Sequence, residues 1–198
     1  QAAEAVRTGR RISPVKSHPL LMELRCHYAL RTSALTARTQ VGNEIQSFLK
    51  LIGAPGGAQS PALMQRVITQ HPTLAAAAQR WLNLDAEAKH YLTAMTTWLK
   101  QHAPEILEPA HIGPVSATQL ILASGLNPQR TASEAGFARL CGLAPIPVRS
   151  GRNQHTYRLS RSGDRDANQA FWRIAFGRSH TDQRTIAYLE KRARQRPH

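Results

Sequence analysis

Acidic residues are scarce in this chain, and their scarcity is the first feature that restricts its function. The 198 residues include 12 Asp and Glu against 26 Lys and Arg, which gives a formal net charge of +14. Residues 130–198 hold fourteen Lys and Arg and five Asp and Glu, so a net charge of +9 falls in the last third. An ordinary solvated surface mixes the two signs, whereas a surface of one sign favours a polyphosphate partner. The charge therefore predicts binding to nucleic acid.

Cysteines and long apolar runs are also rare. Cys26 and Cys141 are far apart and neither has a C-x-x-C partner, which excludes a disulfide framework and a zinc site. No stretch approaches the roughly eighteen apolar residues of a membrane span, and the opening QAAEAVRTGRR lacks the apolar core of a secretory signal. We therefore expect a reduced, cytoplasmic protein that is neither exported nor membrane-spanning. The absence of an initiator methionine indicates a chain that begins within a longer protein.

Clusters of metal ligands are the third absence. The twelve acidic residues are scattered along the sequence, and Asp164 with Asp166 stands among arginines. A divalent cation needs several converging oxygen ligands, which this distribution does not offer. We therefore predict no metal site and no cofactor in this chain.

Two long amphipathic segments dominate the first half of the sequence. Residues 20–52 carry apolar side chains on a seven-residue repeat and end at Gly53, which predicts one long helix with a C-terminal stop. Arg31, Arg38 and Gly42 interrupt this repeat, so the middle of the helix is expected to contact something other than apolar side chains. The repeat consists of Leu21, Leu24, Tyr28, Leu35, Ile45, Leu49 and Ile52.

A second long helix is predicted over residues 85–102, with Asn83 or Asp85 as its N-cap. Before it, PALMQRVITQ and TLAAAAQRWL predict two shorter helices that the His71-Pro72 pair separates. The two long helices are expected to pair as a coiled-coil-like hairpin arm within residues 1–104. Their apolar stripes fit an intramolecular core and a homo-oligomer contact equally well.

Residues 105–198 have a different organisation, and the whole chain is predicted to be mainly α-helical. PAHIGPVSATQLILAS has the outline of a helix-hairpin-helix turn, in which Gly113 would let backbone N–H groups face a phosphate, although His111 replaces the usual first glycine. An ordinary turn before a core helix, with no role in binding, explains this segment equally well. Residues 131–141 predict a helix, and the prolines at 145 and 147 predict a loop or short hairpin after it. Two further helices are predicted from Ser162 or Asp164 onward and over residues 181–194, with Ala167, Ala170, Phe171 and Ile174 inward and arginines such as Arg173 outward.

Three spaced blocks carry a resemblance to a known family: ASEAGFARLCGLAPIPVRSG, RLSRSGDRDANQAFWRI and DQRTIAYLEKR. Together they resemble the C-terminal domain of the insertion-sequence 110/116/902 family of transposases. The resemblance implies an RNA-guided recombinase that cuts and rejoins DNA through a serine. In that family an N-terminal RNase H-like domain with four acidic metal ligands, expected to bind Mg²⁺, precedes a helical arm. By this resemblance, the chain is expected to be truncated at both ends.

The family's serine precedes a glycine, and the matching pair here is Ser150-Gly151. A serine that attacks a phosphodiester needs exposure, a basic shell and close backbone approach, which the glycine permits. Without the resemblance, Ser150 is simply a polar turn residue. The competing Ser160 and Ser162 are expected to cap the following helix. The predicted basic shell is Arg149, Arg152, Arg158 and Arg161, with Asp164, Arg165 and Asn168 positioning the loop or the nucleic acid.

Two functions of different classes follow from these observations. The first is a fragment of a serine-using transposase whose partners are DNA, a structured guide RNA and further copies of itself. The second is a non-catalytic nucleic-acid-binding and oligomerisation module. The Ser150-Gly151 pair supports the first function, and the missing acidic quartet supports the second. A basic helical scaffold for DNA repair is a third reading, which depends only on the hairpin-like turn.

Overall fold

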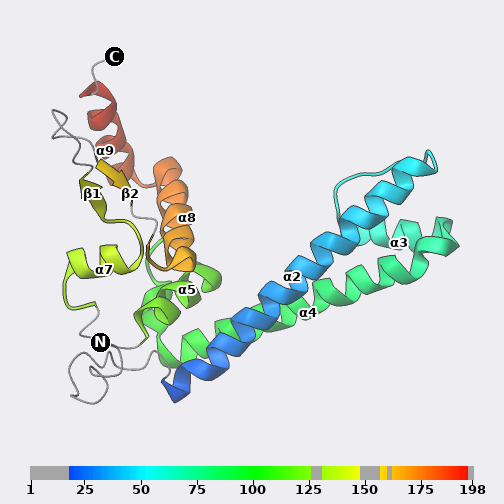
Figure 1. The fold of residues 1–198 in the computed structure, drawn as a ribbon, viewed down its shortest axis with the longest axis horizontal. Coiled ribbons are helices and arrows are strands. Elements are labelled where there is room, and N and C mark those ends of the chain that lie inside the picture. The colour runs from blue at the N-terminus through cyan, green and yellow to red at the C-terminus, as the bar shows by residue number, and fades with distance from the viewer. Residues whose placement is uncertain (1–17, 126–130, 148–156, 160–161, 196–198) are drawn as a thin grey trace, which may run out of the picture. The chain divides into compact units, whose positions relative to one another are not determined.

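The computed structural model describes residues 18–125, 131–147, 157–159 and 162–195. The described chain is mainly α-helical, as predicted, with one pair of short strands (Figure 1). It divides into two compact units, Leu24–His102 and Ala103–His198, the second together with Gln1–Glu23. None of the described helices combines the length and the apolar character that a membrane span requires.

The first unit, here called the arm, contains most of α2 (Pro19–Leu51), α3 (Pro61–Gln70) and α4 (Pro72–His102). The predicted first helix is confirmed almost to the residue, and Gly53 follows it in the left-handed conformation (φ 69°). Ser60 caps α3 by accepting a hydrogen bond from the Leu63 amide at 3.2 Å. The break at His71-Pro72 is also confirmed.

The prediction of a separate helix over residues 85–102 is wrong, because α4 is one continuous helix of 31 residues. Neither Asn83 nor Asp85 caps a helix. The Asn83 side chain accepts a hydrogen bond from Gln79 one turn earlier, and Asp85 is buried in the middle of α4. The alanine-rich stretch at residues 75–78 favours helix, so nothing local ends it before His102.

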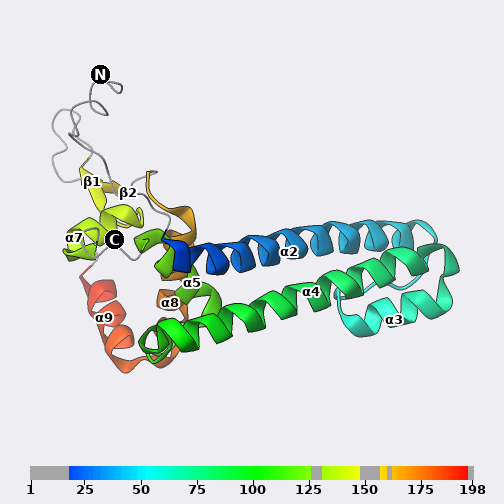
Figure 2. The same cartoon turned by 90° about the horizontal axis from the view of Figure 1, so that it is seen from below.

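Part of the apolar repeat of α2 is buried in the core of the arm. In Figure 2, α2 and α4 run side by side, and their contacts pair early residues of one with late residues of the other, so they are antiparallel. Ile45 and Leu49 pack in one cluster with Met64 and Trp81. Ile45 and Leu49 therefore belong to the intramolecular core and do not form an oligomer contact. Leu21 and Leu24 are also buried, Tyr28 and Leu35 are half-buried, and Ile52 is exposed.

Arg38 interrupts the repeat because it binds the buried carboxylate of Asp85. Its guanidinium pairs with Asp85 and lies 5.2 Å from the centre of the Trp81 ring. Lys89 contacts the other carboxylate oxygen at 2.7 Å. Burial raises the pKa of Asp85, but the hydrogen bonds and charges of Lys89 and Arg38 outweigh burial and lower it overall. The prediction that the middle of α2 contacts a polar partner is therefore confirmed.

The second unit, here called the C-terminal domain, consists of several helices and one short hairpin. Its first part comprises η1 (Pro104–Leu107), α5 (Pro114–Ser124) and α7 (Glu134–Leu140). The predicted helix over 131–141 is therefore shorter than expected, since Ser133 is its cap. The prolines form the predicted hairpin, in which β1 (Pro145–Pro147) pairs with β2 (Tyr157–Leu159). The chain continues into α8 (Arg165–Thr181) and α9 (Gln183–Arg194).

Small side chains line the contact between α5 and α8. Ala123, Ala167 and Ala170 are buried in one cluster with Ile174 and Cys141, as the predicted inward face of α8 requires. Burial, aided by the Asp164 charge, raises the pKa of the Cys141 thiol to about 11. The thiol is therefore a neutral core group near pH 7.

Candidate nucleic-acid interface

The β1–β2 hairpin carries the predicted serine loop between its strands. The strands are antiparallel, with Pro145 opposite Leu159 and Pro147 opposite Tyr157. Residues 148–156 connect them, and this segment contains the Ser150-Gly151 pair. The predicted site residues outside the described part of the chain are Arg149, Ser150, Gly151, Arg152 and Arg161.

Three contacts fix the base of this hairpin. The Asp164 amide donates to the Leu140 carbonyl at 2.8 Å, and the Asn168 side-chain amide donates to the Cys141 carbonyl at 3.1 Å. Gly163 (φ 125°) lies so close that an added Cβ would be 2.6 Å from the Gly142 amide nitrogen. Asn168 therefore ties the end of α7 to the start of α8. Its predicted role in positioning the serine loop or the nucleic acid stays a prediction.

Asp164 is the N-cap of α8. Its Oδ1 accepts hydrogen bonds from the Asp166 and Ala167 amides, each at 3.1 Å. The prediction that Ser160 or Ser162 caps this helix is wrong, because the helix begins at Arg165 and Asp164 directly precedes it. Ser160 lies outside the described residues, and Ser162 is exposed.

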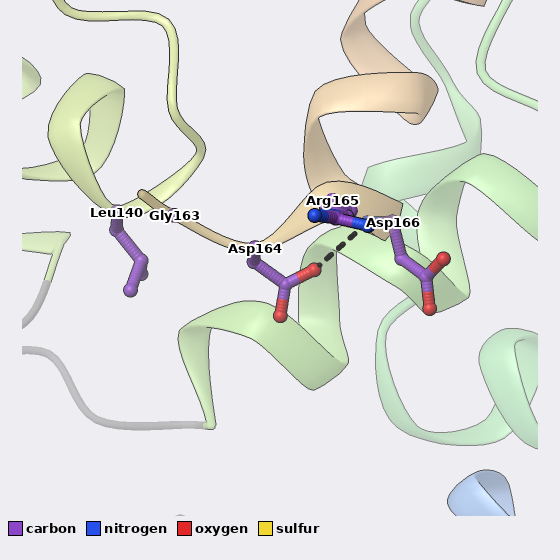
Figure 3. A pocket seen from close by; sticks show the side chains of 5 residues that line it. All are labelled: Leu140, Gly163, Asp164, Arg165 and Asp166. Atoms are coloured by element: carbon purple, nitrogen blue, oxygen red, sulfur yellow. Dashed lines mark hydrogen bonds between the residues drawn. The ribbon is translucent and has the colours of Figure 1, made fainter. Parts of the chain in front are cut away.

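An open depression of about 580 Å³ lies at this end of α8. Figure 3 shows Asp164, Arg165 and Asp166 along the first turn of α8, with Leu140 and Gly163 on the neighbouring segments. The dashed line in the figure is a hydrogen bond that commits Asp164 to its capping role. Arg165 brings one positive charge to this depression, whereas the two carboxylates at its rim would repel a phosphate placed inside it.

The described residues do not fit the divalent cation that the family resemblance implies. Within the described ranges, no three His, Cys, Asp or Glu side chains come close enough to hold a metal ion. One carboxylate oxygen of Asp164 is already used by two backbone amides.

The predicted arginines differ in what they can offer a phosphate. Arg158 on β2 and Arg165 at the start of α8 are exposed. Arg173 was predicted to point outward, but it is half-buried and donates a hydrogen bond to the buried Gln119 side chain. Among the predicted arginines that the structure describes, Arg158 and Arg165 are therefore the two that are exposed to solvent.

The turn before α5 is anchored to the end of α8. His111 has a left-handed backbone (φ 69°), the conformation expected where the helix-hairpin-helix pattern usually has a glycine. Its ring forms a hydrogen bond with the Thr181 hydroxyl. The ring also packs against Gly177, where an added Cβ would be only 2.6 Å from the His111 Nδ1 atom. Gly113 is exposed and is the N-cap residue directly before α5, where no side chain caps the helix.

One exposed feature of α8 was not predicted. Trp172, Phe176 and His180 follow each other at four-residue spacing and are all exposed. The sequence contained the signal, since assigning Ala167, Ala170 and Ile174 to the core places these rings on the opposite face.

The C-terminal domain is thus a small helical domain with an arginine-bearing hairpin, and its sequence is similar to that of a family of transposases. Residues 106–190 match the model described as the Transposase IS116/IS110/IS902 family. The predicted resemblance is confirmed over this segment. No curated protein matches the chain.

Proposed function

We propose that this chain is the part of a DNA transposase that binds the DNA and supplies the nucleophilic Ser150. The family match over residues 106–190 carries this proposal, because the matched segment includes the whole hairpin with its Ser150-Gly151 connection. The contacts at the hairpin base support it, since a loop that presents a nucleophile needs both of its ends held.

The proposed reaction is a transesterification. The Ser150 hydroxyl oxygen attacks the phosphorus of a DNA phosphodiester, a P–O bond to one DNA strand breaks, and that strand leaves as an alcohol that takes up a proton. A hydroxyl of another DNA strand then attacks the serine-linked phosphorus and releases the serine. The number of phosphodiester bonds is conserved, so no external energy source is required. Exposed arginines, with Arg158 and Arg165 among them, stabilise the charge that develops on the phosphate.

Substitution of the serine tests this chemistry. In a protein that joins this chain to an acidic domain of the family, Ser150→Ala should abolish strand cleavage and exchange while DNA affinity stays within about twofold, because many phosphate contacts supply the affinity. Ser160→Ala is the matched control and should retain exchange. Exchange at the parental rate by the Ser150→Ala protein would refute the assignment.

The salt dependence of binding tests the basic surface independently of catalysis. Each arginine–phosphate contact releases condensed counterions, so the affinity of the 198-residue chain for duplex DNA or structured RNA should fall steeply between about 50 and 200 mM salt. Arg158→Gln and Arg165→Gln should each flatten the slope of log K against log[salt] by roughly one. An affinity that does not change with salt would refute binding through these arginines.

We propose the guide RNA as a second ligand of the surface that carries Arg158 and Arg165.

We propose that copies of the chain associate through the end of α2. Because Ile45 and Leu49 are core residues, their replacement by polar residues should unfold the arm. Phe48, Leu51 and Ile52 are exposed and are the better candidates for a contact between copies. Sedimentation of a Phe48→Ser, Leu51→Ser variant should show a smaller assembly with unchanged helix content.

A further inference from the structure

The exposed aromatic residues of α8 form a continuous ladder, here defined as Trp172, Phe176 and His180. The Trp172 and Phe176 rings are stacked, with centroids 5.3 Å apart and planes inclined by 14°. The His180 ring follows with its centroid 4.7 Å from that of Phe176. Residues four apart lie one above the other on a helix, so the three rings form one stripe along α8.

The aromatic ladder lies on the face of α8 that is turned away from the domain core. Ala167, Ala170 and Ile174 fill the core face, whereas Trp172 is 63% exposed and Phe176 is 56% exposed. The other two tryptophans of the chain, Trp81 and Trp98, are 2% and 4% exposed. Contiguous exposed rings are costly in water, and such a patch indicates a binding surface.

The charge around the aromatic ladder selects the kind of partner. Arg165 precedes Trp172 by seven residues, which places it on the same helix face two turns earlier, and its side chain is exposed. Asp166 is the only acidic residue within α8, and helical spacing puts it about 120° around the helix from Trp172. An aromatic stripe with a cation and without an anion complements a chain of bases and phosphates better than it complements an apolar protein surface.

We propose that the aromatic ladder stacks an unpaired base of single-stranded DNA, with Arg165 holding a neighbouring phosphate. This inference depends on the proposed function, which makes DNA the partner. Bases within a duplex cover one another's faces, so only an unpaired base offers a face to Trp172. Insertion between two rings needs about 7 Å, twice the 3.4 Å stacking distance, so the base stacks on the remaining face of Trp172 rather than between Trp172 and Phe176.

Tryptophan fluorescence tests this proposal on the 198-residue chain. Because Trp81 and Trp98 are buried, quenching by a thymine oligonucleotide should come from Trp172 and should disappear in Trp172→Phe. Trp172→Ala should weaken binding of the single strand about tenfold, as expected for loss of one stacked base, with duplex affinity changed less than twofold. Phe176→Ala should also weaken binding of the single strand, but by less than Trp172→Ala. Tyr188→Ala, which removes another exposed ring of the same domain, is the matched control and should leave both affinities unchanged.

Other outcomes would overturn the inference in identifiable ways. Salt-dependent duplex binding with unchanged Trp172 emission would refute the stacking and leave the proposed function standing. Tighter, Trp172-dependent binding of RNA of the same sequence would reassign the aromatic ladder to RNA. A smaller assembly after Trp172→Ala, with DNA affinities unchanged, would assign it to a contact between copies. Absence of binding to duplex and single strand alike would refute the proposed function together with this inference.

Discussion

The arm and the C-terminal domain differ in the size of the side chains that they bury. The arm buries both of its tryptophans, and Trp81 packs among leucine, isoleucine and methionine side chains, whereas half of the buried cluster of the C-terminal domain is alanine and its tryptophan is exposed. Alanines let α5 and α8 approach closely, but they bury little apolar surface. The large rings of the arm bury much more. The arm therefore uses its large rings for its own stability, while the exposed rings of α8 add little to the core of the C-terminal domain.

The two units also fix their polar groups differently. In the arm, one buried carboxylate, Asp85, receives the charges of Arg38 and Lys89 from two helices. In the C-terminal domain, the residues at the hairpin base bond to backbone groups, as Asp164 and Asn168 do. A buried ion pair thus links two long helices of the arm, whereas a cap and backbone contacts hold the ends of the short helices.

Trp81→Ala and Trp172→Ala test the comparison most strongly. Trp81 is enclosed by the arm core, so its truncation should lower the free energy of unfolding by about 3–5 kcal/mol. Trp172 is exposed, and its truncation should change this quantity by less than about 0.5 kcal/mol. Urea unfolding followed by circular dichroism measures both. Equal losses would show that the Trp172 ring belongs to the core after all.

Enlarging an alanine in the α5–α8 contact should give the next largest effect. Ala170→Leu adds three carbon atoms where two helices pack closely, and overpacking should cost about 1–3 kcal/mol of unfolding free energy. Ala175→Leu places the same change on an exposed position of α8 and is the matched control. Thermal unfolding of the two variants measures the difference. A stabilised Ala170→Leu protein would contradict close packing at this contact.

Periodicity in the sequence predicted the long elements well, because local patterns determine them. The repeat of α2 and its stop at Gly53, and the inward face of α8, followed directly from spacing. The continuity of α4 was missed because Asp85 resembles a cap locally, while its partner Arg38 is 47 residues away in the sequence. A single sequence does not show such a distant pairing.

Less of the candidate site could be predicted. The family resemblance selected Ser150, which the composition alone would have left as a turn residue. The contacts at the hairpin base depend on the close approach of Gly163 to Gly142. A glycine in the sequence does not show which other residue its backbone will contact. The rings at 172, 176 and 180 form a four-residue repeat in the sequence, but a repeat alone does not show whether such rings face the core or solvent.

The buried carboxylate of the arm predicts a pH dependence. The folded-state pKa of Asp85 is lowered, so its contribution to stability is complete above its unfolded pKa near 3.8 and is lost as the pH falls through the folded value. Asp85→Asn should cost about 1–2 kcal/mol at pH 7, a modest amount because Lys89 is largely exposed. The difference from the parent should shrink below about pH 4, and denaturant unfolding at pH 7 and pH 3 measures it. A difference that grows in acid would contradict the ion pair.

Capping of α8 should give the smallest effect and tests how the C-terminal domain holds the serine loop. Asp164→Ala removes the acceptor of two amide hydrogen bonds and should cost about 1 kcal/mol of unfolding free energy. Asp164→Asn keeps a capping oxygen without the charge, so it should recover most of that loss. Ser162→Ala should cost less than Asp164→Ala, since Asp164 supplies the cap. Chemical denaturation of the three variants measures these differences. If Ser162→Ala proved the most costly, α8 would begin earlier than Arg165, and the hairpin base described here would be wrong.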